Sequence, residues 1–488
     1  MRARAVPVLS ALVPLLAALW MWRPILGTAF YADDFIHLFD LVTLAPSAFL
    51  TQIWGGHLYL VRNAIFLGMF DAFGADPRPF YWSMLLTHLL NVLLLQRLLR
   101  RLTGDVLLAG AAAVLWGTCP TLEGVLGWYS VWGQALLTTL VLIVLERLAA
   151  TISTRGTLSV RTALVWGTIL AAGGACFGIG LGLAAAFPVA VMIALPPRQR
   201  SARAIGMLGA AAIAILAIYT VVRILAAPHL DPGVRVMLSP GALLAELPAA
   251  VVLAAQMIGV GAYALPFGFL DLAVGHPTMA IGGGLAVALA VGGWVAADPT
   301  TRRCLLALGV LTLAAYGTIA FGRTTALEYL NLSTAHAAAW PRYHYLALAL
   351  LTATGCTALA AMRDAPRDAV SAVDGIALTW AALRLVVLLV RPPALDLHEA
   401  ARVESATSLA AIRAAIAAAP AGGVAVIDNR PFGAAAVPWL FPGWAGLFVI
   451  HFPDDVVDGR TVRFRADDVH WRLAQSRGGR IARLVEAR

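Results

Sequence analysis

The sequence predicts an all-α protein that crosses a membrane many times and carries a small α/β domain at its C-terminal end. Of the 488 residues, 60% are hydrophobic and only 12% are charged, about half the charged share of soluble domains. The mean hydropathy is +0.82, and the apolar residues gather in stretches long enough to span a membrane as helices. From Leu397 onward the composition changes. We therefore predict a membrane domain over 1–396 and an extracytoplasmic domain over 397–488.

The basic balance of the chain predicts its topology. The formal net charge is +9, and the chain contains arginine but no lysine. The arginines gather in short loops between apolar stretches, a pattern that marks the cytoplasmic side of a membrane protein. This pattern accounts for the charge without nucleic acid, so no nucleic-acid partner is predicted. The four cysteines have no CxxC spacing, so neither a disulfide framework nor a metal centre is indicated.

These rules predict eleven spans, with the N-terminus inside and the C-terminus outside. The first span ends at Trp22 and is expected to remain uncleaved. Residues 249–265 are also apolar enough to span, but Arg302 and Arg303 would then lie outside, so we predict a re-entrant or interfacial element there. Residues 35–79 are too polar to span and are expected to form interfacial helices. The other ten spans are 80–96, 106–118, 129–146, 162–176, 179–195, 205–226, 278–297, 304–321, 343–362 and 374–391.

The C-terminal region reads as a small α/β domain. Residues 398–419 alternate alanine with charged residues and are expected to be helical. Val424–Asp428 reads as a short buried strand, because a β-branched run ends there in a turn-forming Asp-Asn pair. Leu447–Ile450 and Thr461–Phe464 are predicted to be two further strands.

An acidic pair, Asp33 and Asp34, directly follows the first span and stands between aromatic residues. Charge so near the hydrocarbon is costly unless it has a function. Adjacent carboxylates also resist ionising together, which suits one of them to proton transfer. A simpler interpretation is a helix end whose carboxylates face water, and composition alone favours neither. On the predicted topology the pair shares the outer face with His57, Arg62, Glu123 and Arg342.

These residues carry a resemblance to a known family. The chain resembles the GT-C superfamily of membrane glycosyltransferases that use polyprenyl-phosphate sugars, which includes protein O-mannosyltransferases and aminoarabinose transferases. The likeness covers roughly the first third of the chain and, more loosely, one late segment. Many relatives have Asp-Glu in place of Asp-Asp, and a second arginine where this chain has His57. The matching stretches are Asp33-Asp34, Leu60–Asn63, Phe73–Pro77, His88–Leu94, Pro120–Val125 with Trp128, and Arg342–Leu346.

The resemblance implies an inverting transfer of a sugar from a polyprenyl-phosphate donor to a protein, lipid or polysaccharide acceptor. The site would lie on the outer face of a bacterial cytoplasmic membrane. Asp33, ranked before Asp34, would be the catalytic base, while Arg342 and Arg62 would bind the donor phosphate. No cofactor is assigned, and the need for a divalent metal is left open, as are the sugar and the acceptor. Substrate-orienting roles fall to His57, Glu123 and Tyr345.

Structural roles explain several of these residues equally well. Glu123 fits a solvated turn and His57 fits interface packing, while His88 is predicted to be a core histidine with its hydrogen bonds satisfied. For the whole protein, the second hypothesis is a transporter or flippase of a lipid-linked glycan, which would show broken helices and inverted repeats. Its best sign is the glycine-rich stretch 173–182, although small residues there also serve close helix packing. A non-catalytic membrane scaffold is the third hypothesis.

Overall fold

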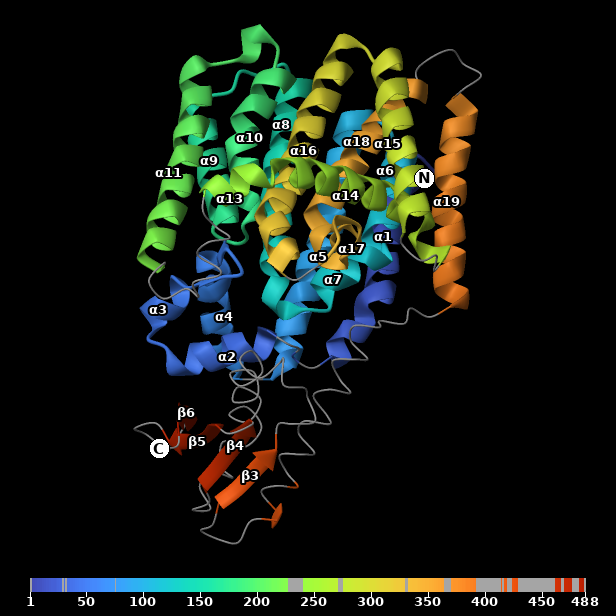
Figure 1. The fold of residues 1–488 in the computed structure, drawn as a ribbon. Helices are drawn as coiled ribbons and strands as arrows, with labels where there is room; N and C mark the ends of the chain where they lie inside the picture. The colour runs from blue at the N-terminus through green and yellow to red at the C-terminus, as the bar shows by residue number, and fades with distance from the viewer. Residues whose placement is uncertain are drawn as a thin grey trace.

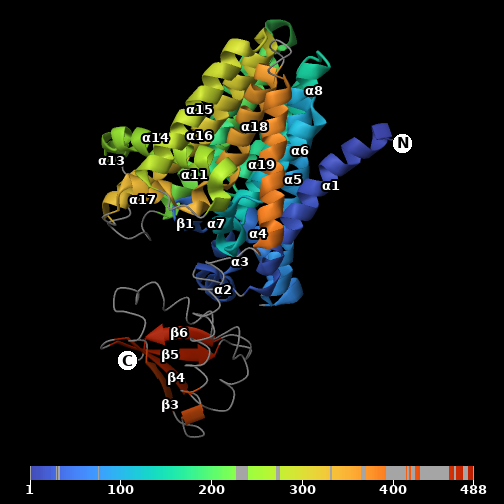
Figure 2. The ribbon, with the colours of Figure 1, turned by 90° about the vertical axis from the view of Figure 1, so that its right-hand side faces the viewer.

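The computed structural model describes most of the helical part of the chain and four strands of the C-terminal part. The described residues are 2–28, 30, 33–74, 76–226, 240–270, 275–329, 332–363, 370–391, 414, 417–418, 424–428, 461–466, 469–475 and 482–486. Most of the long helices run side by side in one bundle (Figures 1 and 2). Together with the apolar helices described next, this arrangement agrees with the predicted all-α multi-pass membrane protein.

Eight helical segments in the described residues are long and apolar enough to cross a membrane. A ninth span results if α6 and the stretch Pro120–Leu126, which are bent by 53° at their break, are taken together. The helices concerned are α1 (Arg2–Trp22), α5 (Pro77–Thr103), α6 (Val106–Gly117), α7 (Glu123–Leu126), α8 (Gly133–Ser153), α11 (Ala202–Ala226), α14 (Leu247–Phe267), α15 (His276–Ala296), α16 (Pro299–Tyr329) and α18 (Tyr345–Arg363).

The predicted count of eleven spans is not confirmed by helix length, although each predicted span falls largely within a helix. α9 (Val160–Gly174) has 15 residues and α10 (Ile179–Ala194) has 16. At about 1.5 Å per residue, both fall short of a hydrocarbon core of about 30 Å. In α19 (Val370–Val390) the apolar part is the shorter stretch Gly375–Val390, which also contains Arg384. Hydropathy alone located these segments but could not show where their helices end.

The stretch 249–265, predicted not to span, lies within α14. This helix has 21 residues and is apolar enough to cross a membrane. Figure 1 shows α13 (Pro240–Ala245) and α14 lying across α16 and not along it. Length allows a crossing and orientation favours the predicted interfacial element, so the topology beyond α14 stays a prediction.

Accessibility labelling at Thr300 tests this topology. Thr300 lies in the first turn of α16, next to Arg302 and Arg303, and the positive-inside rule places it in the cytoplasm. A Thr300→Cys variant should therefore resist a membrane-impermeant thiol reagent in intact cells and react after permeabilisation. Ser47→Cys, on the exposed face of α3, should react in intact cells. The four native cysteines are buried and should give little background. Labelling of Thr300→Cys in intact cells would mean that α14 crosses the membrane.

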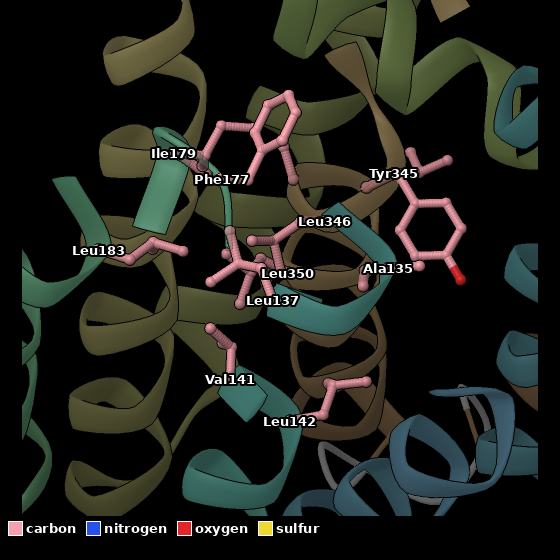
Figure 3. Packing of buried hydrophobic residues seen from close by; sticks show 14 of the residues in the cluster. Ala135, Leu137, Val141, Leu142, Phe177, Ile179, Leu183, Tyr345, Leu346 and Leu350 are labelled. Atoms are coloured by element: carbon pink, nitrogen blue, oxygen red, sulfur yellow. The ribbon is translucent and has the colours of Figure 1, made fainter. Parts of the chain in front are cut away.

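The core of the bundle is well packed where α8, α10 and α18 meet. Figure 3 shows Leu137 and Val141 of α8 close to Leu346 and Leu350 of α18, with Leu183 of α10 on the other side. All five side chains are buried. Inside a membrane, van der Waals packing of this kind holds helices together, because lipid is as apolar as leucine.

Short elements gather at one end of the bundle and position the polar residues. α2 (Asp33–Thr43), α3 (Pro46–Leu50) and α4 (Leu60–Phe73) lie together there (Figure 1). A small hairpin joins α3 to α4 through β1 (Ile53–Trp54) and β2 (His57–Leu58). None of these described elements is a candidate span, which agrees with the interfacial helices predicted for 35–79. The remaining elements used below are α17 (Thr334–Ala338) and the 3-10 turns η3 (Tyr129–Val131), η6 (Gly268–Leu270) and η7 (Pro341–Tyr343).

The C-terminal part contains a four-stranded sheet with the order β3-β4-β5-β6. β3 (Val424–Asp428) pairs in parallel with β4 (Thr461–Ala466), which confirms two of the predicted strands. β5 (Val469–Gln475) and β6 (Ala482–Glu486) continue the sheet antiparallel and were not predicted. The predicted strand Leu447–Ile450 and most of the predicted helix 398–419 lie outside the described residues.

Candidate active site

The side chain of Asp34, in α2, forms hydrogen bonds with η3, the 3-10 turn that precedes α8. Its Oδ1 accepts hydrogen bonds from the backbone N–H of Ser130 at 2.6 Å and from the Ser130 hydroxyl at 2.7 Å. Its Oδ2 lies 3.5 Å from the hydroxyl of Tyr81 on α5. The Asp34 side chain is only 1% exposed. A buried carboxylate with this set of donors holds α2, η3 and α5 together, which is a structural task.

Asp33 occupies a different environment from its neighbour. It is partly exposed, and its Oδ2 accepts a hydrogen bond of 3.4 Å from the indole N–H of Trp54. Partial burial raises the pKa of Asp33, while Trp54 and the charges of Arg342, Arg62 and Arg323 act in the opposite direction. Of the two carboxylates, Asp33 is therefore the more accessible, and it faces several cations.

Arg62, on α4, is fully buried at 0% exposure. Its Nε and Nη2 donate to the Asn63 side-chain oxygen at 3.0 and 2.5 Å, and its Nη1 donates to the Ser130 carbonyl at 3.0 Å. Its Nη2 also lies 3.5 Å from His37 Nδ1, and its guanidinium lies 4.1 Å from the ring centre of Tyr59. Each of its nitrogens is thus engaged by protein. This geometry favours a structural role over the phosphate-binding role predicted from the sequence.

His57 and Arg323 form a pair in which one hydrogen-bond acceptor is missing. The backbone N–H of Gly178 points at His57 Nδ1 over 3.2 Å, and Arg323 Nη2 lies 3.1 Å from His57 Nε2. Burial and the neighbouring arginines hold the pKa of His57 well below 6.5, so the imidazole is neutral. A neutral imidazole has one accepting nitrogen and one N–H. It cannot accept from both donors, so at one of its nitrogens two N–H groups face each other.

Arg342 lies in an aromatic enclosure with unused hydrogen-bonding capacity. Its guanidinium lies 4.5 Å from the ring centre of Trp340, 5.3 Å from that of Tyr343 and 5.4 Å from that of Trp128. Its Nε and the Tyr343 hydroxyl are buried without a hydrogen-bond partner among the described residues. Buried polar atoms normally have partners. A water or a ligand oxygen is the natural partner for these two groups.

The backbone of Arg342 is held in place by α7 and α8. Gln134 Nε2 donates to the Arg342 carbonyl at 2.7 Å. Gly124 of α7 packs directly on η7, because a Cβ at this position would collide with the backbone of Pro341 and Arg342. Glu123, the first residue of α7, is half-buried beside it. The predicted Pro120–Val125 block therefore supports the arginine through packing at Gly124.

Enlarging Gly124 should displace Arg342. Overpacking a tight contact typically costs about 1–3 kcal/mol, so Gly124→Ala should shift η7 and lower activity while the bundle still folds. Gly68→Ala in α4 is the matched control, since a Cβ there meets no atom within 4 Å. Turnover and thermal stability of both variants would be measured. Equal behaviour of the two would show that the packing of α7 on η7 does not set the position of Arg342.

Tyr345 belongs to the core and not to this cluster. Its hydroxyl lies 2.7 Å from His88 Nδ1 and 3.3 Å from Asn91 Nδ2. His88 Nε2 in turn lies 2.9 Å from the Gly117 carbonyl. His88 is thus the satisfied core histidine that the sequence predicts. The substrate-orienting role implied for Tyr345 is not favoured by this position, because the hydroxyl is fully buried between α5 and α18.

Sequence reasoning missed Arg323 and Tyr343 as members of the site. Arg323 stands near the end of α16, and only the fold brings it to His57, 266 residues earlier in the chain. Its position just after a predicted span on the outer side was the available signal. Among the described residues no three His, Cys, Asp or Glu side chains are grouped to hold a metal ion. In the comparisons with known proteins, no protein-family model and no curated protein matches the chain.

Proposed function

We propose that the protein is a membrane glycosyltransferase that moves a sugar from a polyprenyl-phosphate donor to an acceptor on the extracytoplasmic side. The observation that carries the proposal is the position of Asp33, a partly exposed carboxylate under the influence of several arginines, one of which, Arg342, has a buried Nε without a hydrogen-bond partner among the described residues. A base beside an anion site is what this transfer needs. The resemblance to the GT-C superfamily in the same residues supports the choice of donor.

The anion site consists of Arg342, Arg323 and His57. With His57 Nδ1 accepting from Gly178, a phosphate oxygen beside His57 Nε2 and Arg323 Nη2 would accept from both of their N–H groups and supply the missing acceptor. Another oxygen would satisfy the buried Nε of Arg342. Charge-assisted hydrogen bonds of this kind are about twice as strong as neutral ones. In this proposal Arg323 and His57 take the phosphate-binding place first given to Arg62.

The chemistry proposed for the site is a single displacement. Asp33 takes the proton of the acceptor nucleophile while its oxygen attacks the anomeric carbon from the face opposite the phosphate. The bond from that carbon to the phosphate oxygen breaks, and its electron pair leaves with the polyprenyl phosphate. Arg342 and Arg323 stabilise the charge that develops on the leaving group. The anomeric configuration is therefore inverted in the product.

A transfer assay distinguishes this function from transport. The purified protein in sealed liposomes would receive a panel of polyprenyl-phosphate sugars, with membranes of cells that lack the protein as the source of acceptor. The proposal predicts release of polyprenyl phosphate, detected by mass spectrometry, and an inverted sugar in the product. A flippase would instead move the intact donor between leaflets without cleaving it. Cleavage of no donor in the panel, together with leaflet exchange, would contradict the proposal.

The pH dependence of turnover should report Asp33. Burial raises the pKa of Asp33 above its usual value of 3.8, and a base works only when it is deprotonated. Turnover should therefore fall as the pH is lowered through the raised pKa, at a higher pH than for an exposed aspartate. The profile of kcat/KM would show one acidic limb. A profile that stays flat down to the pKa of an ordinary carboxyl would exclude Asp33 as the base.

A further inference from the structure

A second, separate feature lies within the helical bundle. A cavity of about 300 Å³ lies between α6, α14, α15, α18 and α19. Its walls are almost wholly apolar, with Leu115, Phe267, Leu285, Leu351 and Trp380 among the lining residues. An apolar cavity of roughly half this volume stays dry and takes benzene. The natural occupant of this cavity is therefore hydrocarbon and not water.

The polar atoms at the cavity wall are already used. The hydroxyls of Thr352 and Thr354 line the cavity but donate to the Leu348 and Leu350 carbonyls of their own helix. Ile376 of α19 also lines the cavity and is 60% exposed on the outside of the bundle. The cavity thus borders the surface that faces lipid, so a chain can enter sideways from the membrane.

An arginine stands one helical turn from the cavity. Arg384 of α19 is only 3% exposed, and it follows Trp380 by four residues. Its guanidinium lies 5.5 Å from the ring centre of Phe269, whose ring lies 5.9 Å from that of Trp380. Aromatic rings therefore connect the charge to the wall of the cavity.

Arg384 has only neutral partners among the described residues. Its Nε donates to the Thr118 hydroxyl at 3.1 Å, and its Nη2 donates to the Thr118 carbonyl. No carboxylate within the described part of the chain forms an ion pair with it, in contrast to Arg363, which pairs with Asp105. A buried cation in a membrane protein is costly, and the dipoles of Thr118 stabilise the charge of Arg384 without neutralising it. An anionic group bound beside Arg384 would neutralise it.

We infer that the cavity binds the hydrocarbon chain of a lipid phosphate whose anionic head lies at Arg384. The apolar cavity suits the hydrocarbon chain of the lipid. The charge of Arg384, one helical turn away, suits the phosphate. A single amphiphile satisfies both features, while a neutral lipid or a soluble anion satisfies only one. The site does not depend on the proposed transfer reaction. The shared chemistry is a phosphate on a long apolar chain, from either a phospholipid or a polyprenyl phosphate.

Native mass spectrometry of the purified full-length protein tests this site. The probes are dioleoyl phosphatidic acid, undecaprenyl phosphate and the net-neutral dioleoyl phosphatidylcholine. The inference predicts preferential retention of one or both of the first two, and the pattern identifies which source of phosphate is used. Equal retention of all three probes, or retention of none, would overturn the inference.

Two variants test separately how the cavity binds the hydrocarbon chain of the lipid and how Arg384 binds its head group. Gly355→Leu fills the cavity, because a Cβ at Gly355 meets only Leu289, at 3.8 Å. Binding of the preferred lipid should weaken at least about tenfold. The matched control is Gly309→Leu in α16, where a Cβ meets no atom within 4 Å. Arg384→Gln should remove the preference for the anionic lipids, since the hydrogen bonds to a charged group are lost. Unchanged binding by Gly355→Leu, or an unchanged preference in Arg384→Gln, would contradict the site, and the first test holds even if Arg384→Gln fails to fold.

Discussion

Asp33→Asn should abolish most sugar transfer, with a loss of roughly 10²–10⁴-fold in turnover, which is the typical effect of removing a general base. The change is nearly isosteric and keeps an oxygen that can accept from Trp54. Folding and donor binding should therefore stay close to those of the wild type. The measurement is turnover of the polyprenyl-phosphate donor alongside thermal unfolding.

Comparison with Asp34→Asn distinguishes a catalytic carboxylate from a structural one. Asp34 accepts from the Ser130 N–H and hydroxyl in a buried position, so its replacement should lower the unfolding temperature. Weakening hydrogen bonds to a buried charged group costs about 1.5–3 kcal/mol. Asp33→Asn should thus lose turnover while its unfolding temperature stays unchanged. In Asp34→Asn the unfolding temperature should fall, and this should be the larger effect. The reverse pattern would exchange their roles, and full activity in both variants would make the pair an ordinary helix end.

Arg342→Ala should lower kcat/KM by about 30- to 1,000-fold, because loss of a charged contact in an enclosed site removes on the order of 2–4 kcal/mol of transition-state stabilisation. Arg342→Lys should recover little, since lysine lacks the planar fork. Arg78→Ala is the control, because Arg78 is an exposed arginine that forms a surface ion pair with Asp76. If Arg342→Ala behaved like Arg78→Ala, Arg342 would be no more than a membrane anchor.

The helical class and the position of the acidic pair were predictable because both depend on local sequence. Long apolar runs predict helices, and Asp33 and Asp34 directly follow the first of them. The strands β3 and β4 were found for the same reason, from β-branched runs. β5 and β6 each contain only one β-branched residue, Val469 and Val485, so their strand pattern is weaker.

Which arginines and aspartates of the site have structural roles depends on contacts between residues that are distant in the sequence. No local pattern shows that Asn63 and Ser130 occupy the donors of Arg62, or that Arg323 meets His57. The difference between two adjacent aspartates likewise arises from Ser130, which is 96 residues away from Asp34. Span counts also depended on helix ends that hydropathy does not show, as α9 and α10 illustrate.

A structure of the protein with bound polyprenyl phosphate tests the central claim most directly. The account predicts phosphate density in hydrogen-bonding contact with Arg342 and Arg323, with His57 Nε2 beside it and Asp33 facing the position of the anomeric carbon. Arg62 should keep its present partners, Asn63 and Ser130. Phosphate density bound only elsewhere, with the Arg342 and Arg323 guanidiniums left as they are here, would contradict the proposed transferase site.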